Sequence, residues 1–342
     1  MKIFTKAPHK IEGQPISNFP LLSLLYNAEH NNFTSNDNHK IVETPEAADV
    51  IIIPQFLNFY IKNDLLDIPY NFLSELKEID KPIWMSVSGD YEFINPFKQV
   101  TLFQYSISKS RESAWNAIMP SLVSDPYKGL NTDFRTLPFT STPKVGFCGY
   151  ATNSIIETCR SFISKNRIER SIRPYLREVD FYAPALLRYK VLSYFEKIGN
   201  LETDFIYRKQ YRAGIKHLSR ANKNAHITTT EYLNNLVDNQ YTVCIRGMGN
   251  FSIRFYQTLA AGRIPLFIDV DSTFPLRETI EKKDIFPILS IKEKSKWEEQ
   301  ILAFHHRKME KFEELQIEIR GFWKDNYGKE SFFNQYLKNL NR

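Results

Sequence analysis

The chain has 342 residues, of which 42% are hydrophobic, and its formal net charge is +6. This length is enough for two domains of ordinary size, each with its own apolar core. The positive charge is too diluted for a dedicated nucleic-acid binder, and it suits attraction to an anionic donor or to a lipid surface. No apolar run approaches the roughly 20 residues that span a bilayer, so we expect no membrane-spanning helix.

The first half of the chain alternates short β-rich runs with polar or helical stretches. The predicted strands are residues 2–5, 50–53, 82–88, 101–106 and 117–122. This alternation is typical of parallel strands joined by helical crossovers. Residues 27–40 are rich in Asn, His and Ser, and we expect a mobile surface loop in which His39 is solvated.

A turn-rich segment at residues 139–143 precedes a second set of strands and is the predicted domain boundary. The second set comprises residues 145–148, 180–183, 205–207, 242–245 and 264–268. Residues 295–298 have the pattern of a capping box that opens a helix. The spacing of the apolar residues beyond it predicts one buried helical face, formed by Trp297, Ile301, Phe304, Phe312, Leu315 and Ile319.

The three cysteines, Cys148, Cys159 and Cys244, do not have the spacing of a metal site. Two of them fall in predicted strands, so we expect buried, reduced thiols. The N-terminal sequence turns polar after four residues, which does not match a secretory signal peptide. We therefore expect a cytoplasmic protein.

The segment from Cys244 to Leu276 carries the clearest functional signal. Its pattern predicts a strand, a loop with two glycines, a helix that begins near Ser252, and a second buried strand. The free N–H groups at the helix N-terminus favour an anion, and arginines beside them can add charge-assisted hydrogen bonds to a phosphate. The same Gly-x-Gly turn also occurs in α/β proteins whose loops bind nothing, and that interpretation stays open.

The segment resembles the nucleotide-sugar signature of the exostosin family of glycosyltransferases. That signature runs approximately Cys-x-x-Pro-x-Gly, a short gap, Ser-x-Arg-x-x-Glu/Asp-Ala and Gly-Cys-Ile-Pro-Val-Ile. The residues of this chain that fall on it are Cys244, Gly247, Ser252, Arg254, Gly262, Ile264 and Pro265. Residues 43–54 and 144–150 are similar to two further family segments, in the same order along the chain.

Three residues depart from the family pattern. Arg246 stands close to where the family has proline, and Arg263 replaces a cysteine. Gln257 occupies the place of an acidic residue that, in the family, looks like an acceptor for a ribose hydroxyl. An amide oxygen can still accept that bond, but without charge it makes a weaker one. The departures bear on which donor is bound.

The resemblance implies an α/β fold of the GT-B type, with two Rossmann-like domains facing a central cleft and C-terminal helices crossing back. On this interpretation residues 1–138 bind the acceptor and residues 139–320 bind the nucleotide sugar. Residues 321–342 return toward the first domain. The implied activity is inverting transfer of a hexose or pentose from a nucleotide sugar, by analogy a uridine one, to a surface glycan such as capsule or lipopolysaccharide.

The implied partners are a nucleotide-sugar donor and a glycan or lipid-linked glycan acceptor, with contact to the inner face of a membrane and no nucleic acid. Such an enzyme would be a bacterial or viral relative that works in the cytoplasm. The predicted donor-binding residues are Gly149, Arg208, Arg246, Gly247, Gly249, Asn250, Phe251, Ser252, Arg254 and Gln257.

A base that deprotonates the acceptor hydroxyl is expected at a strand end of the first half. The candidates are Asp90, Glu92 and His9, although a loop carboxylate is more often a turn acceptor. Asp269 and Asp271 imitate an Asp-x-Asp metal motif. Because cationic side chains and a helix terminus can hold the diphosphate, we expect no metal and no other cofactor.

Two alternatives remain at the level of sequence. A non-catalytic protein with the same fold could bind a nucleotide sugar or a glycan. A nucleic-acid or membrane-surface protein could use the basic excess, and its binding would collapse with salt.

Overall fold

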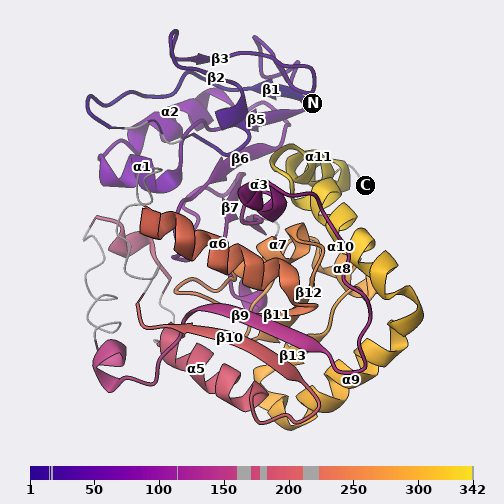
Figure 1. The fold of residues 1–342 in the computed structure, drawn as a ribbon. Helices are drawn as coiled ribbons and strands as arrows, with labels where there is room; N and C mark the ends of the chain where they lie inside the picture. The colour runs from indigo at the N-terminus through magenta and orange to yellow at the C-terminus, as the bar shows by residue number, and fades with distance from the viewer. Residues whose placement is uncertain are drawn as a thin grey trace. The chain divides into compact units, whose positions relative to one another are not determined.

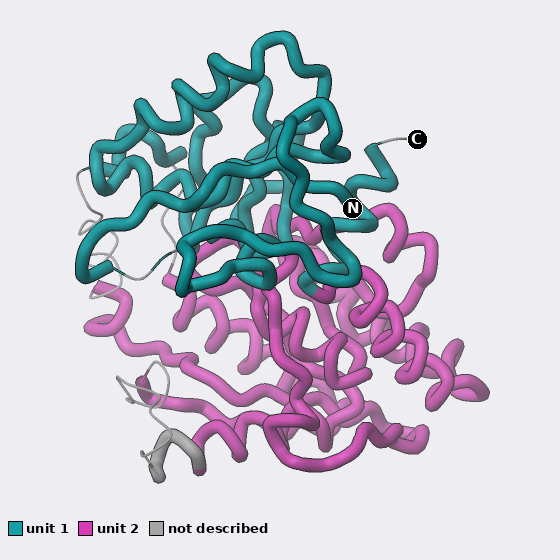
Figure 2. Tube along the Cα trace, turned by 90° about the horizontal axis from the view of Figure 1, so that it is seen from above, with its two compact units in different colours: residues 1–119, 168–179, 329–342 teal, residues 120–167, 180–328 magenta. Residues whose placement is uncertain are grey.

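The computed structural model describes residues 1–14, 16, 18–113, 115–159, 171–177, 183–210 and 223–340. The chain divides into two compact units, coloured separately in Figure 2. Unit 1 comprises Met1–Met119, Ile168–Val179 and Lys329–Arg342, and unit 2 comprises Pro120–Arg167 and Asp180–Gly328. The predicted boundary near residue 139 does not coincide with this division. Residues from Pro120 onward belong to unit 2, where Tyr127 packs on Leu236 and Val237.

Unit 1 is built on a six-stranded parallel sheet with the order β4-β1-β5-β6-β7-β8 (Figure 1). Its strands are short apolar runs, and alternate residues of each run face opposite sides of the sheet. The strand bounds are β1 Lys2–Phe4, β4 Lys40–Ile41, β5 Val50–Ile52, β6 Ile83–Ser86, β7 Val100–Gln104 and β8 Asn116–Ile118.

The two faces of this sheet support two separate cores. On one face Ile51, Met85 and Leu102 pack with helices α1, Leu57–Lys62, and α2, Asp67–Glu75. On the other face the core includes Trp84 and Phe103 together with side chains of the last helix, α11, Lys329–Leu340. The C-terminal helix is therefore part of the core of unit 1.

The segment 27–40 differs from the expected solvated loop. A hairpin of β2, Tyr26–Asn27, and β3, Asn32–Phe33, overlaps its start. His39 is only 1% exposed, because the chain at this point lies against the C-terminal helix. The neighbouring Asn38 donates a hydrogen bond of 2.7 Å to Glu330 of α11.

Unit 2 contains a five-stranded parallel sheet with the order β10-β9-β11-β12-β13. The strands are β9 Lys144–Tyr150, β10 Glu202–Arg208, β11 Tyr241–Cys244, β12 Ile264–Asp269 and β13 Ile288–Ser290. The helices of this unit are α3 Pro126–Leu130, α5 Pro184–Phe195, α6 Lys223–Asp238, α7 Ile253–Ala260, α8 Arg277–Lys283, α9 Trp297–Arg307 and α10 Phe312–Tyr327. The prediction of two Rossmann-like α/β units with parallel sheets is confirmed.

Several local predictions can be compared with unit 2. The strand expected at 180–183 lies outside the described residues except for Ala183, which precedes α5. The prediction of a capping box at residues 295–298 is wrong, because the N-cap residue of α9 is Lys296 and its side chain makes no capping hydrogen bond. The buried apolar face beyond it is confirmed, but it extends over two helices, α9 and α10. Cys148 and Cys244 are buried free thiols, as expected, whereas Cys159 is exposed.

In each sheet the chain first adds a strand on one side of the first strand and then adds the remaining strands on its other side. The point between these two sides is the switch point of the sheet. In unit 1 β4 lies on one side of β1 and β5 on the other, so the reversal falls between β1 and β5. In unit 2 β10 and β11 flank β9, so the reversal falls between β9 and β11. Open parallel sheets bind ligands outside the carboxyl ends of the strands at such switch points. Among the described residues no helix is long and apolar enough to cross a membrane.

Candidate functional site

The switch point of unit 2 is a place where two strands separate. Strand β9 pairs with β11 at Val145 and Gly146, whereas with β10 it stays paired as far as Tyr150. The side chain of Arg254, from α7, reaches the main chain of β9 beyond the last pair with β11. Its Nη2 donates a hydrogen bond of 2.8 Å to the carbonyl oxygen of Cys148, and its Cζ lies 4.0 Å from the centre of the Phe147 ring.

Gly149 allows the guanidinium to pass directly over the main chain of β9. A Cβ atom added to Gly149 would lie 2.7 Å from Nη2 of Arg254, well inside van der Waals contact. The guanidinium and the glycine are therefore in direct contact at the carboxyl end of β9. The sequence indicated both residues for donor binding, and the structure brings them together.

The charge of Arg254 is buried, and no described carboxylate pairs with it. The residue is 9% exposed, and none of the ion pairs among the described residues includes it. Its Nε has no hydrogen-bond partner among the described residues, and the Tyr232 ring lies 5.8 Å from Cζ. Burial of an unpaired charge costs several kcal/mol, as an order of magnitude, so a bound anion at this position would be strongly stabilised.

Arg188 is a second cation at the same edge, and sequence reasoning missed it. From α5 its Nη1 donates to the carbonyl oxygen of Tyr150 at 3.4 Å, and its Nη2 donates to that of Arg246 at 3.3 Å. It thus bridges the chain ends that leave β9 and β11. The motif could not have indicated it, because Arg188 lies in a different helix, about 60 residues upstream.

The start of α7 provides the third feature of the site. Ser252 is its N-cap residue, but its side chain makes no capping hydrogen bond. The first N–H groups of a helix have no partner inside the helix, and they carry the positive end of the helix dipole. With Arg254 in the first turn, this terminus can bind a phosphate.

The loop between β11 and α7 is closed by its own hydrogen bonds. The N–H of Gly247 donates to the carbonyl oxygen of Phe251 at 2.9 Å, so this amide is not among those left for a ligand. The guanidinium of Arg246 turns back onto the loop, where Nη2 donates to the Met248 carbonyl oxygen at 3.4 Å. Gly249 is buried inside the loop.

Three other predicted donor residues have structural partners. The Asn250 amide donates to the Asp271 carbonyl oxygen at 2.7 Å and so ties the loop to the chain after β12. Arg208, at the end of β10, forms a 2.7 Å ion pair with Glu231. The Gln257 side-chain oxygen accepts a 2.5 Å hydrogen bond from the Tyr232 hydroxyl. Each of these side chains therefore has at least one polar atom that is bonded to the protein and is not available to a ligand.

The Asp-x-Asp sequence after β12 is also tied into the protein. Asp269 accepts a hydrogen bond of 3.1 Å from the N–H of Ser272, and its carboxylate lies 3.8 Å from Arg277. Asp271 adopts a left-handed backbone conformation with φ of 66°. In the part of the chain that the structure describes, no three His, Cys, Asp or Glu side chains gather as a metal site would need.

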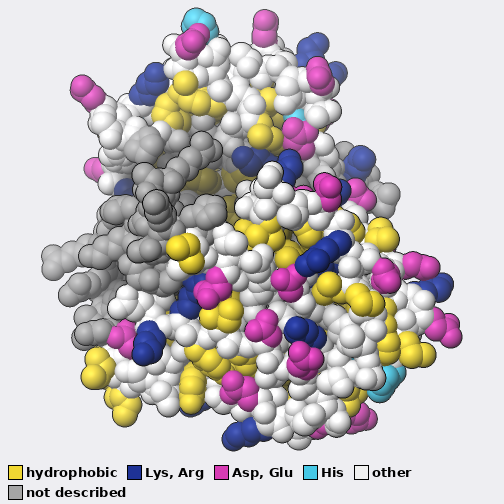
Figure 3. Space-filling model, viewed as in Figure 1, with side chains coloured by type: hydrophobic (Ala, Val, Ile, Leu, Met, Phe, Trp, Pro, Cys, Tyr) yellow, Lys and Arg dark blue, Asp and Glu magenta, His cyan; other side chains and the backbone are white. Residues whose placement is uncertain are grey.

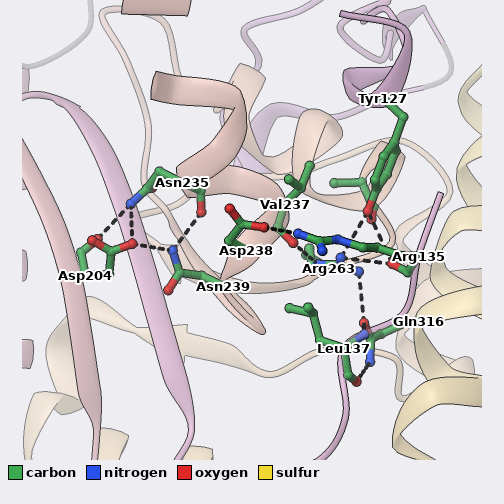
Figure 4. A network of polar contacts seen from close by, with 11 residues as sticks. Tyr127, Arg135, Leu137, Asp204, Asn235, Val237, Asp238, Asn239, Arg263 and Gln316 are labelled. Atoms are coloured by element: carbon green, nitrogen blue, oxygen red, sulfur yellow. Dashed lines mark hydrogen bonds and ion pairs between the residues drawn. The ribbon is translucent and has the colours of Figure 1, made fainter. Parts of the chain in front are cut away.

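Arg263, the other departure from the exostosin pattern, has a structural role (Figure 4). It is fully buried, and burial lowers the pKa of its guanidinium to about 10. Its nitrogens donate to the carbonyl oxygens of Val237 and Arg135 and to the side chains of Tyr127 and Gln316, at 2.8 to 3.0 Å. Arg263 therefore links α6, α10 and the segment 127–135.

The three candidate bases all belong to unit 1. Asp90 is exposed and follows Gly89, whose φ is 103°. Partial desolvation raises the pKa of Asp90, and solvent screening limits that rise. Glu92 is buried, with Arg177 at 3.5 Å and Arg111 at 3.6 Å. This pairing makes Glu92 an anchor for the segment around Arg177. His9 is exposed at a pocket near the switch point of unit 1.

No protein-family model and no curated protein matches the chain. Similar solved structures include a mutant of S. aureus TarM in complex with fondaparinux, alpha-GlcNAc-glycerol and UDP, at 9% identity and a TM-score of 0.36. Others are the spinosyn rhamnosyltransferase SpnG, at 10% and 0.36, and WaaG, a glycosyltransferase involved in lipopolysaccharide biosynthesis, at 9% and 0.33.

The matches cover 86%, 98% and 95% of this chain, and 55%, 100% and 95% of TarM, SpnG and WaaG. The chain thus spans about half the length of TarM. At these identities and TM-scores the similarity carries no argument about activity. The resemblance to exostosins stays a prediction, and the function has to be argued from the site itself.

Proposed function

We propose that unit 2 binds a nucleoside diphosphate sugar at the switch point between β9 and β11, and that the protein is a glycosyltransferase. The observation that supports this most strongly is Arg254, a buried guanidinium that forms no ion pair with a carboxylate of the described residues, in the first turn of a helix with no side-chain cap. A diphosphate would supply negative charge beside the guanidinium and would accept hydrogen bonds from N–H groups at the start of α7.

The same groups suit the chemistry of glycosyl transfer. As the bond between the sugar and the diphosphate breaks, negative charge grows on the departing oxygens. Fixed donors that are already oriented, here the guanidinium of Arg254 and the N-terminus of α7, stabilise this charge more than that of the bound donor. A uridine diphosphate leaving group, no metal requirement and inversion at the anomeric carbon complete the proposal, with a surface glycan as acceptor.

Inversion needs a base on the acceptor hydroxyl, and the exposed Asp90 and His9 fit this task better than the paired Glu92. The raised pKa of Asp90 brings its proton affinity closer to that needed for general base catalysis near neutral pH. Substitution of Asp90 by Asn is expected to lower kcat while leaving binding of the donor intact.

The proposal is tested first by binding. A thermal-shift series with uridine, UDP, ADP and GDP should show stabilisation by UDP that uridine does not give, because ligands selective for the folded state raise its stability. Arg254→Met should weaken UDP binding about 10- to 100-fold, since charge-assisted hydrogen bonds contribute roughly 1.5–3 kcal/mol. Arg307→Met is the matched control, because Arg307 is exposed and pairs with Asp284.

Activity is tested next, by release of UDP from UDP-sugars with and without a chelator. Full turnover in chelator is the expected result, and strict dependence on manganese would contradict the metal-free proposal. If every nucleotide stabilised wild type and Arg254→Met equally, the proposed donor site at Arg254 would be wrong.

A non-catalytic nucleotide-sugar binder is the second candidate. It is favoured by one observation: Gln257 stands in place of a carboxylate, and its side-chain oxygen is occupied by Tyr232. This candidate predicts selective UDP binding without release of UDP from any UDP-sugar. A nucleic-acid binder is less well supported, because Figure 3 shows lysines and arginines interspersed with carboxylates on the visible face.

A further inference from the structure

The sheet of unit 2 ends in a strand that is paired on one side. β10 is the outer strand, and all of its residues, from Glu202 to Arg208, are in register with β9. All but the first are partly exposed, whereas β11, inside the sheet, is buried throughout. Among the described residues no strand pairs with the other side of β10. Such an edge presents main-chain N–H and C=O groups to any extended chain that lies beside it.

One hydrogen bond shows which main-chain groups of β10 point outward. The N–H of Glu202 donates to the Pro143 carbonyl oxygen at 3.0 Å, on the side of β9. Because successive residues of a strand direct their N–H and C=O groups to opposite sides, those of Thr203, Phe205 and Tyr207 point away from the sheet. None of these groups is hydrogen-bonded to a described residue. β10 can therefore accept a further strand.

A groove runs along this edge between β10 and α6. Its volume is about 560 Å³; its lining residues in β10 are Asp204 and Ile206, and those in α6 extend from Ile227 to Asp238. The lining residues of α6 recur every three or four positions, so they form one continuous stripe along the helix. A strand added beside β10 would place every second side chain in this groove.

The groove carries carboxylates. Oδ2 of Asp204 accepts hydrogen bonds from the side-chain amides of Asn235, at 3.0 Å, and Asn239, at 2.7 Å (Figure 4). These amides orient the carboxylate and leave its charge in place, and none of the ion pairs formed by the described residues includes Asp204. Glu231 and Asp238 add two carboxylates that are about half exposed, each in contact with one arginine.

Next to Asp204 the groove is apolar. Ile206 lies two positions further along the same face of β10, and Ile227 of α6 is 63% exposed. On an added strand, the residue opposite Asp204 points to the same face of the sheet, where a lysine or arginine can donate to the carboxylate. An apolar residue two positions away would cover both isoleucines. The groove therefore matches an extended segment with a cation and an apolar residue on one face.

The same charges distinguish between two kinds of occupant. Carboxylates on an edge strand oppose the pairing of identical chains. A second copy of this chain would bring its own Asp204 to the shared groove, and the two like charges would repel each other. A basic segment of a different chain meets no such repulsion, so charge complementarity favours it.

We propose that β10 and the groove beside α6 bind an extended basic segment of another protein by strand addition. Its main chain pairs with Thr203, Phe205 and Tyr207, and a lysine or arginine meets Asp204. Arg254 does not line this groove, and the inference does not depend on the donor site.

The test uses the full chain and a fluorescent heptapeptide, Thr-Lys-Thr-Ile-Thr-Lys-Thr, whose lysines and isoleucine share one face in either strand direction. Fluorescence anisotropy should show saturable binding that is lost when glutamate replaces both lysines. Two further peptides carry N-methyl groups, one on the threonines and the other on the lysines and isoleucine. Strand addition predicts that one of these loses binding and the other keeps it, because only alternate amides face β10.

Two variants test the groove itself. Asp204→Asn keeps an acceptor for the two asparagines and removes the charge, so the lysine peptide should bind at least about tenfold more weakly. Asp325→Asn is its control, because Asp325 is exposed on α10 and does not line the groove. Ile227→Ser should weaken binding about fivefold, since part of one apolar side chain is no longer covered. Its control is Ile317→Ser, because Ile317 is 57% exposed on α10.

The outcomes decide between strand addition and its alternatives. Absence of saturable binding up to about 1 mM peptide, equal binding of the glutamate peptide, or binding retained by both N-methylated peptides would overturn the proposal. A dimer of the full chain in analytical ultracentrifugation that the peptide dissociates would overturn it in favour of a second copy. Peptide binding that weakens in Asp204→Asn, with the thermal shift by UDP unchanged, supports the proposal independently of the donor site.

Discussion

At the scale of single residues, the site of unit 2 depends on a contact between positions more than 100 residues apart. Arg254 reaches the carbonyl oxygen of Cys148 because Gly149 has no side chain. A glycine in a strand is otherwise unfavourable, since it has no side chain to pack. The close approach of the guanidinium is the physical reason for it here.

Gly149→Ala tests this contact. The added Cβ would lie 2.7 Å from Nη2 of Arg254, so the guanidinium has to leave the Cys148 carbonyl oxygen. We expect UDP to bind at least about tenfold more weakly while the protein stays folded, as judged by circular dichroism. Gly199→Ala is the control, because a Cβ there meets nothing within 4 Å. Unchanged UDP affinity in Gly149→Ala would show that the position of Arg254 does not matter for binding.

His305 is a buried residue whose protonation opposes folding. Its Nε2 donates to the Thr140 carbonyl oxygen at 2.7 Å, which leaves Nδ1 to accept from the Tyr241 hydroxyl at 2.8 Å. This neutral form is favoured further because burial lowers the pKa of His305 below its ordinary value of 6.5. Below about pH 6.5 the unfolded chain therefore binds a proton that the folded one does not, and stability falls as the pH falls.

Urea unfolding at pH 7.5 and pH 5.5 measures this effect. Wild type should lose more stability between the two pH values than His305→Gln, which keeps polar atoms at the site and has no proton to gain. An identical loss in both proteins would mean that His305 does not contribute to the pH dependence.

At the scale of elements, unit 2 is held together by side chains that connect helices rather than by helix contacts alone. Arg263, at the amino end of β12, joins α6 and α10 through Val237 and Gln316. Arg320 connects α10 to the start of α3, because its Nη2 donates a hydrogen bond of 2.5 Å to the carboxylate of Asp125. Such buried polar links define the position of each helix because an unsatisfied partner is costly.

Arg263→Met is expected to destabilise unit 2 by at least about 2 kcal/mol, because several buried acceptors lose their donor at once. The affinity for UDP of the protein that remains folded should not change, since the buried guanidinium of Arg263 donates its hydrogen bonds to protein acceptors. Lys283→Met provides the control, because Lys283 forms an exposed pair with Glu318. A loss of UDP affinity at full stability would instead place Arg263 in the binding site.

At the scale of the whole molecule, the chain passes between the two units four times, after Met119, Arg167, Val179 and Gly328. The last passage gives unit 1 a helix from the far end of the sequence. Phe332 and Phe333 are fully buried there, and the Phe333 ring lies 5.9 Å from that of Trp84 and 5.4 Å from that of Phe103. Unit 1 therefore cannot complete its core before α11 has been synthesised.

Phe333→Ala should destabilise unit 1 by about 3–5 kcal/mol, because it leaves a cavity in a closely packed aromatic cluster. Hydrogen exchange followed by mass spectrometry should show faster exchange in β5, β6 and β7, with protection of β11 and β12 unchanged. Uniform loss of protection in both units would show that they unfold as one.

The sequence by itself determined where the central buried strands of this protein lie. Apolar runs such as those at residues 50–53 and 264–268 specify buried strands, since their side chains can be removed from water only inside a two-sided sheet. The glycine-bearing turn before Ser252 likewise indicated where an anion would bind, because local spacing defines a strand, a loop and a helix N-terminus.

Only the tertiary structure decided which of the polar residues face that site. Asn250, Arg208 and Gln257 fit the motif, yet their partners come from other segments and occupy their polar atoms. Arg188 had no place in any motif and lies at the edge all the same. Spacing along the chain defines the backbone locally, whereas the partner of a polar side chain depends on which distant segments pack beside it.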